Sequence, residues 1–189
     1  MRTRTNVMFL TVCAVLGCGS KQAADFSRFH GIYRIDSHTF NASACDAEGN
    51  AVSGSDPLLV LFSMFAMNVG NFAVAESCSD VAACRGRAKN PVPMVMTAAD
   101  FDASFSTVAS DGQGLTGTSF GLETSGQVAH VDENVLVRTD EEIRIEMRQY
   151  VLSCEINGGK CDENATIAAA SSTPCKALRV VVATFQEGL

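Results

Sequence analysis

Residues 143–151 read IRIEMRQYV, and this stretch decides the fold class. Apolar side chains at positions 143, 145, 147 and 151 alternate with charged ones at 144, 146 and 148. Successive side chains of a β-strand point to opposite faces of the sheet, so a period of two predicts a half-buried strand. We therefore expect a domain built from strands that each turn one face toward a core.

The same period recurs on both sides of this stretch, separated by turn residues. Further strands are expected at residues 31–41, 58–65, 72–77, 101–107, 116–122, 128–138 and 178–184. The strand over 128–138 is expected to break near Asp132-Glu133-Asn134. Residues 79–88, with Ser79 or Asp80 as N-cap, and residues 162–171, acidic at their start, predict two short helices.

Eight strands joined by short turns predict a mainly β fold, either an antiparallel barrel or a sandwich of about eight strands, with one or two short helices. In the first strand, the alternation places Tyr33 and Ile35 on one face. It places the even-numbered residues, including His38, on the opposite face.

Residues 57–75 contain no charged side chain and could be mistaken for a membrane span. The turn sequence NVGN at residues 68–71 interrupts the run and predicts a hairpin between two buried strands. Acidic residues flank the run at positions 56 and 76, and no basic cluster follows to stop transfer across a membrane. We expect a buried hairpin here.

The first eighteen residues have the pattern of an export signal. Arg2 and Arg4 precede a mostly apolar run at residues 7–16. A bilayer span needs about 20 apolar residues, so this run has the length of a signal-peptide core instead. It ends in Val15-Leu16-Gly17-Cys18, which resembles the lipobox of bacterial lipoproteins. The resemblance implies cleavage before Cys18 and attachment of lipid to its sulfur and amine.

In that family an Asp after the lipidated cysteine retains the protein in the inner membrane. Gly19 stands at this position, so the resemblance implies the outer membrane. The expected organisation is a lipoprotein signal peptide at residues 1–17, a lipid-anchored tether at 18–28 and a single β-rich domain at 29–189. A length of 189 residues suits one domain.

The cysteines agree with an exported protein. Cleavage would remove Cys13, and lipidation would occupy Cys18, which leaves six of the eight. These are Cys45, Cys78, Cys84, Cys154, Cys161 and Cys175. An even number in an oxidising compartment predicts three disulfides, whose pairing the sequence does not determine. Zinc is the weaker interpretation because the chain contains no C-x-x-C pair.

Composition and charge exclude several classes of partner. The formal net charge is −7, and no basic stripe is present to bind phosphates, so nucleic acid is not expected as a partner. The apolar content of 47% fits a globular chain. The membrane, reached through the lipid anchor, is the one partner that the sequence indicates.

Two short motifs overlap in a glycine-rich stretch. Residues 112–117 (GQGLTG) fit a dinucleotide-binding pattern, and residues 117–121 (GTSFG) fit the nucleophile elbow of serine hydrolases. Both chemistries need a strand–turn–helix unit, whereas residues 118–126 continue with the alternation of a strand. We interpret the stretch as a turn entering a strand and expect no cofactor and no catalytic residue.

No metal site is expected either. His30 and His38 are eight residues apart, about 26 Å along an extended strand, and cannot share one ion. His130 has acidic neighbours in Asp132 and Glu133, which a solvated loop would also explain.

Residues 29–33 (FHGIY) are similar to the start of lipocalin-like domains, where a short turn leads into a G-x-aromatic motif on the first strand. Here the motif is Gly31-x-Tyr33, with Tyr where Trp is usual. The resemblance implies a barrel whose base is closed by this aromatic, covered by Arg179 from the last strand. It also implies a ligand cavity. The candidate lining residues, which would otherwise be plain core, are Phe62, Met64, Phe65 and Met67.

As a whole, the chain resembles small uncharacterised cysteine-rich lipoproteins of Gram-negative bacteria, a resemblance that adds location and little chemistry. We expect a non-enzymatic, lipid-anchored cell-envelope protein with a disulfide-stabilised β-domain for binding or structural roles. The alternative is a lipocalin-like carrier of a small apolar ligand. A hollow interior lined by apolar side chains would favour the carrier.

Overall fold

The computed structural model describes residues 25–66, 70–89, 101–122, 127–154 and 161–189. Its strands are β1 (Gly31–Asn41), β2 (Asn50–Ala51), β3 (Leu58–Ala66), β4 (Gly70–Cys78), β5 (Asp102–Phe105), β6 (Thr107–Val108), β7 (Gly114–Leu122), β8 (Val128–Arg138), β9 (Glu142–Ser153) and β10 (Ala177–Glu187). The helices are a 3-10 turn, η1 (Ser27–Phe29), and two α-helices, α1 (Val81–Lys89) and α2 (Glu163–Ala170). The expected mainly β fold is confirmed.

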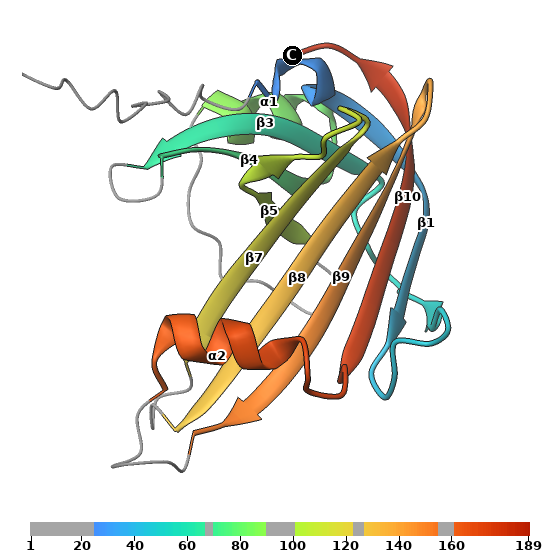
Figure 1. Ribbon diagram of the computed structural model, residues 1–189. Coiled ribbons are helices and arrows are strands. Elements are labelled where there is room, and N and C mark those ends of the chain that lie inside the picture. The colour runs from blue at the N-terminus through green and yellow to red at the C-terminus, as the bar shows by residue number, and fades with distance from the viewer. Residues whose placement is uncertain (1–24, 67–69, 90–100, 123–126, 155–160) are drawn as a thin grey trace, which may run out of the picture.

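All strand pairs are antiparallel, and together they form a nearly closed barrel (Figure 1). The order around the sheet is β5-β4-β3-β1-β10-β9-β8-β7-β6, with β2 paired to β1. β5 and β6 stand at the two ends of this path, yet Ser106 alone separates them in the chain. Its backbone N–H donates to the Thr116 carbonyl of β7 at 2.9 Å. This bend brings the sheet edges together, so the barrel is the correct one of the two expected architectures.

The charge-free segment forms the hairpin β3–β4, as expected. Its register runs from Leu58 opposite Cys78 to Ala66 opposite Gly70. The middle of its turn, residues 67–69, lies outside the described residues. Among the residues that the structure describes, no helix is long and apolar enough to cross a membrane.

Large apolar side chains fill one end of the barrel. Phe26, directly before the turn η1, and Phe29, the last residue of that turn, are buried in this core beside Tyr33. The Tyr33 hydroxyl donates to the Phe29 carbonyl at 2.7 Å, which satisfies its one buried polar group. Phe26, which lies within the segment 18–28 expected as a tether, is thus part of the folded core. We call this the plugged end.

Steric crowding explains why a glycine occupies the first position of the Gly31-x-Tyr33 motif. A Cβ at Gly31 would lie 2.6 Å from the nearest ring carbon of Phe185 on β10, closer than real Cβ contacts allow. The Phe185 ring in turn meets the Tyr33 ring edge-on, with centroids 5.6 Å apart. The first and last long strands thus pack closely at the plugged end.

Helix α1 covers the outer face of β3 and β4. Asp80 is its N-cap, since its Oδ1 accepts the Ala83 N–H at 2.8 Å. Below the helix lies a second apolar cluster that includes Ile32, Val60, Phe62 and Val74. Arg87 of α1 reaches the buried Glu76 carboxylate at 3.5 Å. Burial, followed by the charge of Asp102 across the β4–β5 pair, raises the pKa of Glu76.

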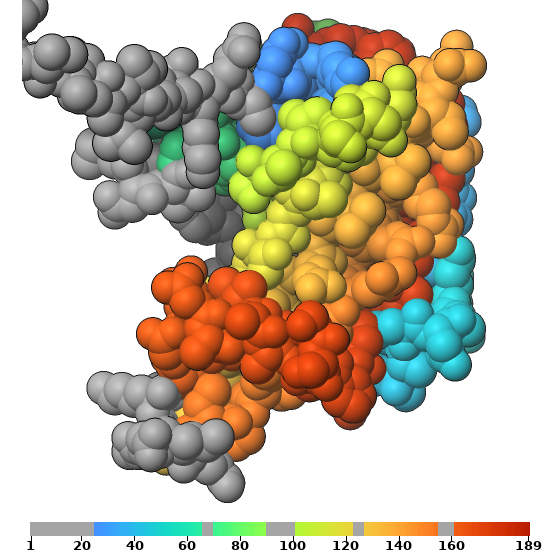
Figure 2. Space-filling view, in the orientation of Figure 1, coloured from blue at the N-terminus to red at the C-terminus, as the bar shows by residue number. Residues whose placement is uncertain are grey.

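Helix α2 packs on the outside of β7, β8 and β9, near the end opposite to the plug (Figures 1 and 2). The Asp162 carboxylate caps it by accepting the Ala165 N–H at 2.9 Å. Its residues Ile167 and Ala170 pack with Cys175 and with Phe120, Val131, Tyr150 and Leu152 on the outer face of the sheet, and together they form a third apolar cluster. Both expected helices are confirmed.

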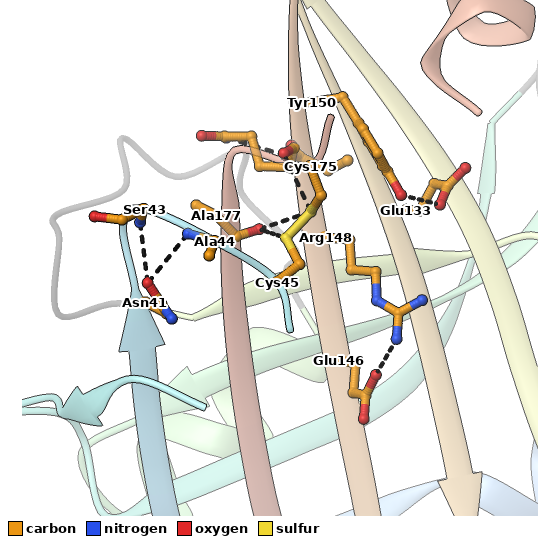
Figure 3. The surroundings of a disulfide bond; sticks show 12 residues. Asn41, Ser43, Ala44, Cys45, Glu133, Glu146, Arg148, Tyr150, Cys175 and Ala177 are labelled. Carbon is orange, nitrogen blue, oxygen red and sulfur yellow. Dashed lines mark hydrogen bonds and ion pairs between the residues drawn. A yellow bond between two sulfur atoms is a disulfide. The ribbon is translucent and has the colours of Figure 1, made fainter. Parts of the chain in front are cut away.

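The six expected cysteines form three disulfides, Cys45–Cys175, Cys78–Cys84 and Cys154–Cys161. The first joins the loop after β1 to the residues before β10, across a sequence separation of 130 (Figure 3). The other two close short segments, with separations of 6 and 7. Cys78–Cys84 fastens α1 to β4.

The expected break in β8 is wrong. All eleven residues of β8 pair with β9, and most also pair with β7. An inner strand has both rows of backbone hydrogen bonds satisfied, which outweighs the low strand propensity of Asp and Asn. The polar side chains divide between the two faces: Asp132 and Asn134 point inward, and Glu133 points outward to the Tyr150 hydroxyl at 2.9 Å.

We predict that the two partly exposed disulfides contribute unequally to stability. In the chain-entropy model, a cross-link that closes 130 residues adds about 5 kcal/mol, against about 2 kcal/mol for one that closes 7. The double variant Cys45→Ala/Cys175→Ala should therefore lose more unfolding free energy in urea than Cys154→Ala/Cys161→Ala. Equal losses would contradict the assigned pairing.

Candidate ligand site at the polar end of the barrel

The barrel interior changes from apolar to polar along its length. Residues paired in register on neighbouring strands point to the same face of the sheet. We call each row of inward-facing register partners across β10, β9, β8 and β7 a rung. One rung is fully buried and apolar: Val181, Ile145, Leu136 and Leu115. The next holds Arg179, Met147, Asn134 and Gly117. The one after holds Ala177, Gln149, Asp132 and Ser119.

A β-bulge in β1 adds a histidine to this interior. Ile35 pairs with Ala183 and Ser37 pairs with Val182, so Asp36 is an extra residue on β1. An extra residue shifts the alternation by one and reverses the face of every later side chain. His38 therefore lies opposite the inward-facing Val181, and its expected position on the outer face is wrong.

His38 is buried without a hydrogen bond. Its side chain is 5% exposed, and neither ring nitrogen has a partner within the part of the chain that the structure describes. The ring meets Phe101 edge-on, with centroids 6.1 Å apart. Burial, assisted by the positive charge of Arg179, lowers the pKa of His38 to about 4. The neutral ring offers one donor and one acceptor to the interior.

Asn134 offers a second unused polar atom. It is 2% exposed, and its Nδ2 donates to the Ser104 carbonyl at 3.1 Å, which fixes the orientation of the amide. Its Oδ1 is buried and, among the described residues, has no partner. A buried acceptor left unpaired costs roughly 1–3 kcal/mol, so such atoms are rare in folded proteins.

Asp132 anchors a hydrogen-bonded group one rung further out. Gln149 Nε2 donates to its Oδ1 at 3.1 Å, and the Ser119 hydroxyl also bonds to it. Burial is the largest influence and raises the pKa of this carboxyl, against the opposing effects of these bonds and of the charges on His130 and Arg179.

Arg179 faces Phe40 across the β1–β10 pair. The two residues are in register, and the Arg179 guanidinium carbon lies 5.2 Å from the centre of the Phe40 ring. Such a cation–π contact orients the planar guanidinium. We name the set His38, Phe40, Ser119, Asp132, Asn134, Gln149 and Arg179 the polar end.

Two disulfides frame the polar end. Cys45–Cys175 precedes Ala177, and the adjacent Lys176 N–H donates to the Gln149 carbonyl at 2.7 Å. The loop that carries Cys45 is held by Asn41, whose Oδ1 accepts the N–H groups of Ser43 and Ala44 at 3.0 and 3.2 Å (Figure 3). Cys154–Cys161 lies beyond the end of β9. A rim held in this way is pre-organised for binding.

The residues expected to line an apolar cavity do not face the interior together. Phe62 and Met64 pack in the outer cluster under α1, and Phe65 is 73% exposed. Met67 lies outside the described residues, as does Cys18. Neighbours on a strand point to opposite faces, so a run of consecutive apolar residues cannot line one cavity.

The lipocalin-like expectation for Arg179 is also wrong. Tyr33 does lie at the closed base of the barrel, but Arg179 is at the opposite end, over Phe40. Two other cations lie near the base: Arg28, whose guanidinium carbon is 4.8 Å from the Phe29 ring centre, and Arg138, which donates to the Arg28 carbonyl. His30 also lies near the base, with its Nε2 2.7 Å from the Ser63 hydroxyl, and is remote from His38.

The glycine-rich stretch is a turn entering a strand, as expected. Gly112 has a φ of 71° in the turn, and residues from Gly114 to Leu122 form β7. No helix follows, so neither the dinucleotide nor the nucleophile-elbow geometry is present in this described segment. Ser119 bonds to the Asp132 carboxyl. The described residues also contain no cluster of three or more His, Cys, Asp or Glu side chains able to hold a metal ion.

Comparisons of the chain with protein-family models, with curated proteins and with solved structures find no match. The site must therefore be interpreted from its own chemistry. The site combines half-buried hydrogen-bond donors and acceptors with buried polar atoms that have no partner, the ring nitrogens of His38 and the Oδ1 of Asn134. Such a combination suits the binding of a small polar molecule.

We predict a pH-dependent stability that depends on His38. Its folded pKa of about 4 lies below the unfolded value of 6.5, so the unfolded chain binds more protons between these values. Stability is then complete above pH 6.5 and falls by up to about 3 kcal/mol as the pH drops toward 4.

The comparison with His38→Phe, which retains an aromatic ring against Phe101, isolates this effect. Asp132 and Glu76, whose pKa values are raised, titrate in both proteins and cancel in the difference. Urea unfolding at several pH values measures it. A wild-type minus variant difference that stays constant from pH 4 to 6.5 would show that His38 is not held neutral in the fold.

Proposed function

We propose that the chain is a non-enzymatic, lipid-anchored protein of the bacterial outer membrane whose disulfide-stapled barrel binds a small polar ligand at the polar end. One observation carries the binding role: His38 and Asn134 present unpaired polar atoms to the interior from side chains that are 5% and 2% exposed. A ligand that pairs with them recovers the free energy that their burial costs.

The envelope location is supported by chemistry at two places in the chain. Residues 15–18 have the lipobox pattern, after an apolar run of signal-peptide length. The six cysteines of the described domain are all disulfide-bonded, which suits an oxidising compartment outside the cytoplasm. The proposed anchor at Cys18 uses the cysteine that directly follows the signal sequence.

The alternative, a carrier of an apolar ligand, has less support. Such a carrier needs a hollow apolar interior, but the apolar part of this barrel is packed with side chains that include Phe29, Leu61, Phe105 and Ile145. The part of the interior that remains partly accessible is polar. The geometry therefore favours a polar ligand.

Lipidation is tested by mass. The full chain, expressed with its own leader in a Gram-negative host and extracted in mild detergent, should have a denatured, non-reduced mass that corresponds to a chain starting at Cys18, plus acyl groups, minus six hydrogens. The Cys18→Ser variant should lose the acyl mass, and the matched Cys13→Ser variant should retain it. An acyl-free wild-type chain would overturn the anchor.

Ligand binding is tested on the same protein by native mass. We expect an excess over the denatured mass that corresponds to one bound small molecule. The His38→Phe variant should lose this excess, whereas His30→Phe, near the plugged end, should keep it. An excess that persists in His38→Phe would contradict the polar end as the site, and its absence from wild type would contradict the binding role.

A further inference from the structure

A pocket of about 640 Å³ lies at the plugged end, where η1, α1 and the end of β10 come together (Figure 1). Its volume is in the range of small-molecule sites, and it is separate from the polar end. We propose that this pocket binds the phosphate group of an anionic phospholipid from the membrane that holds the lipid anchor, an inference that rests on the proposed function. The lining includes His30, Phe62, Ser63, Arg85, Lys89 and Leu189.

Helix α1 gives one wall of this pocket a positive charge, although the chain as a whole is acidic. Arg85 and Lys89 line the pocket, whereas Arg87 of the same helix reaches the Glu76 carboxylate. Arg85 contacts Glu187 at 3.3 Å, but an exposed ion pair of this kind contributes little stability, so a phosphate can replace it. Lys89 is exposed and forms no ion pair with another residue that the structure describes. Its ammonium group is therefore the main cation for an anionic ligand.

The pair formed by His30 and Ser63 adds a neutral hydrogen-bond donor to the same pocket. The Nε2 atom of His30 lies 2.7 Å from the Ser63 Oγ. Burial lowers the pKa of His30, so the ring is neutral at neutral pH and carries one N–H. If the hydroxyl donates to Nε2, the Nδ1–H of the ring is left over, and if Nε2–H donates to the hydroxyl, the O–H is left over. In both cases one donor remains for a phosphate oxygen.

The apolar part of the lining favours a phospholipid over free phosphate. Phe62 and Leu189 line the same pocket as the cations of α1, and Leu189 is 51% exposed. Phe65 follows Ser63 by two residues on β3, about 7 Å along the strand, and is 73% exposed. Exposed apolar side chains beside basic ones are typical of surfaces that lie in a membrane interface. A free phosphate would leave these apolar side chains without a contact.

The path of the chain places the pocket near the proposed anchor. The described chain begins at Asp25, which precedes the pocket residue His30 by five positions. Asp25 follows Cys18 by seven positions, and seven residues span at most about 25 Å. A lipid on Cys18 would therefore keep the pocket close to the membrane surface, where phospholipids present phosphate groups above acyl chains.

The test uses the histidine rings as reporters, because the chain contains only three histidines. The full chain, expressed with its own leader and labelled with ¹³C-histidine, is studied by NMR in a non-ionic detergent at pH 7. The His30→Gln variant assigns the His30 signal, and His38, buried in the barrel interior, is the internal reference. The probes are dihexanoyl-phosphatidylglycerol, dihexanoyl-phosphatidylcholine and inorganic phosphate.

Phosphatidylglycerol should shift the His30 signal saturably and leave the His38 signal in place. Inorganic phosphate should bind at least about tenfold more weakly, because it lacks the acyl chains. Phosphatidylcholine should also bind more weakly, because its choline group brings a second cation to the pocket. Lys89→Gln should weaken phosphatidylglycerol binding about fivefold, the contribution of one lysine beside an anionic lipid. The matched variant Lys176→Gln, exposed near the polar end, should leave this binding unchanged.

Each probe tests a different part of the assignment. Inorganic phosphate that binds as tightly as phosphatidylglycerol would overturn the lipid as the ligand. Phosphatidylcholine that binds as tightly, or phosphatidylglycerol binding that Lys89→Gln does not weaken, would overturn the role of charge. The absence of a saturable shift in a chain whose denatured mass includes acyl groups would overturn this pocket and leave the proposed anchor intact. An acyl-free mass would instead overturn the anchor, and the polar end is tested separately by native mass.

Discussion

The pairing of β1 with β10 is the constraint on which the rest of the barrel depends. These strands lie near the two ends of the chain, and their contact joins the β3–β4–β5 half of the sheet to the β7–β8–β9 half. Bringing β1 against β10 closes a loop that contains most of the chain, and closing so long a loop costs conformational entropy. The Cys45–Cys175 disulfide offsets part of this cost by linking the same two regions. Without the pair, neither the plugged end nor the polar end would be assembled.

Local features of the fold were predictable because their causes are local. The period of two predicted the strands, and the turn at residues 68–71 predicted the β3–β4 hairpin. The helix starts were predicted at Ser79 or Asp80 and at the acidic residue Asp162, and Asp80 and Asp162 are the caps. The even count of cysteines predicted three disulfides. Their pairing could not be predicted, because it depends on which strands meet in space.

The candidate site was not predictable, and the reason is a single residue. Strict alternation placed His38 outside the barrel, whereas the extra residue Asp36 turns it inside. The bulge has a partner in Thr184, whose hydroxyl donates to the Asp36 carboxylate, but no short sequence pattern marks it. The pairing of Arg179 with Phe40 follows from the same shift in register. Asp132 and Asn134 were visible as an interruption in an apolar strand, a signal that here marks a polar interior and not a break.

The two ends of the barrel differ, and this difference would orient the barrel relative to a membrane. The described chain enters at the plugged end, where Phe26 and Phe29 seal the interior, and the polar end lies at the opposite pole. With a lipid on Cys18, the barrel would be attached to the membrane at its plugged end. Its polar end would then point away from the bilayer, so that the half-buried polar side chains of that end would face the aqueous phase and not the lipid surface.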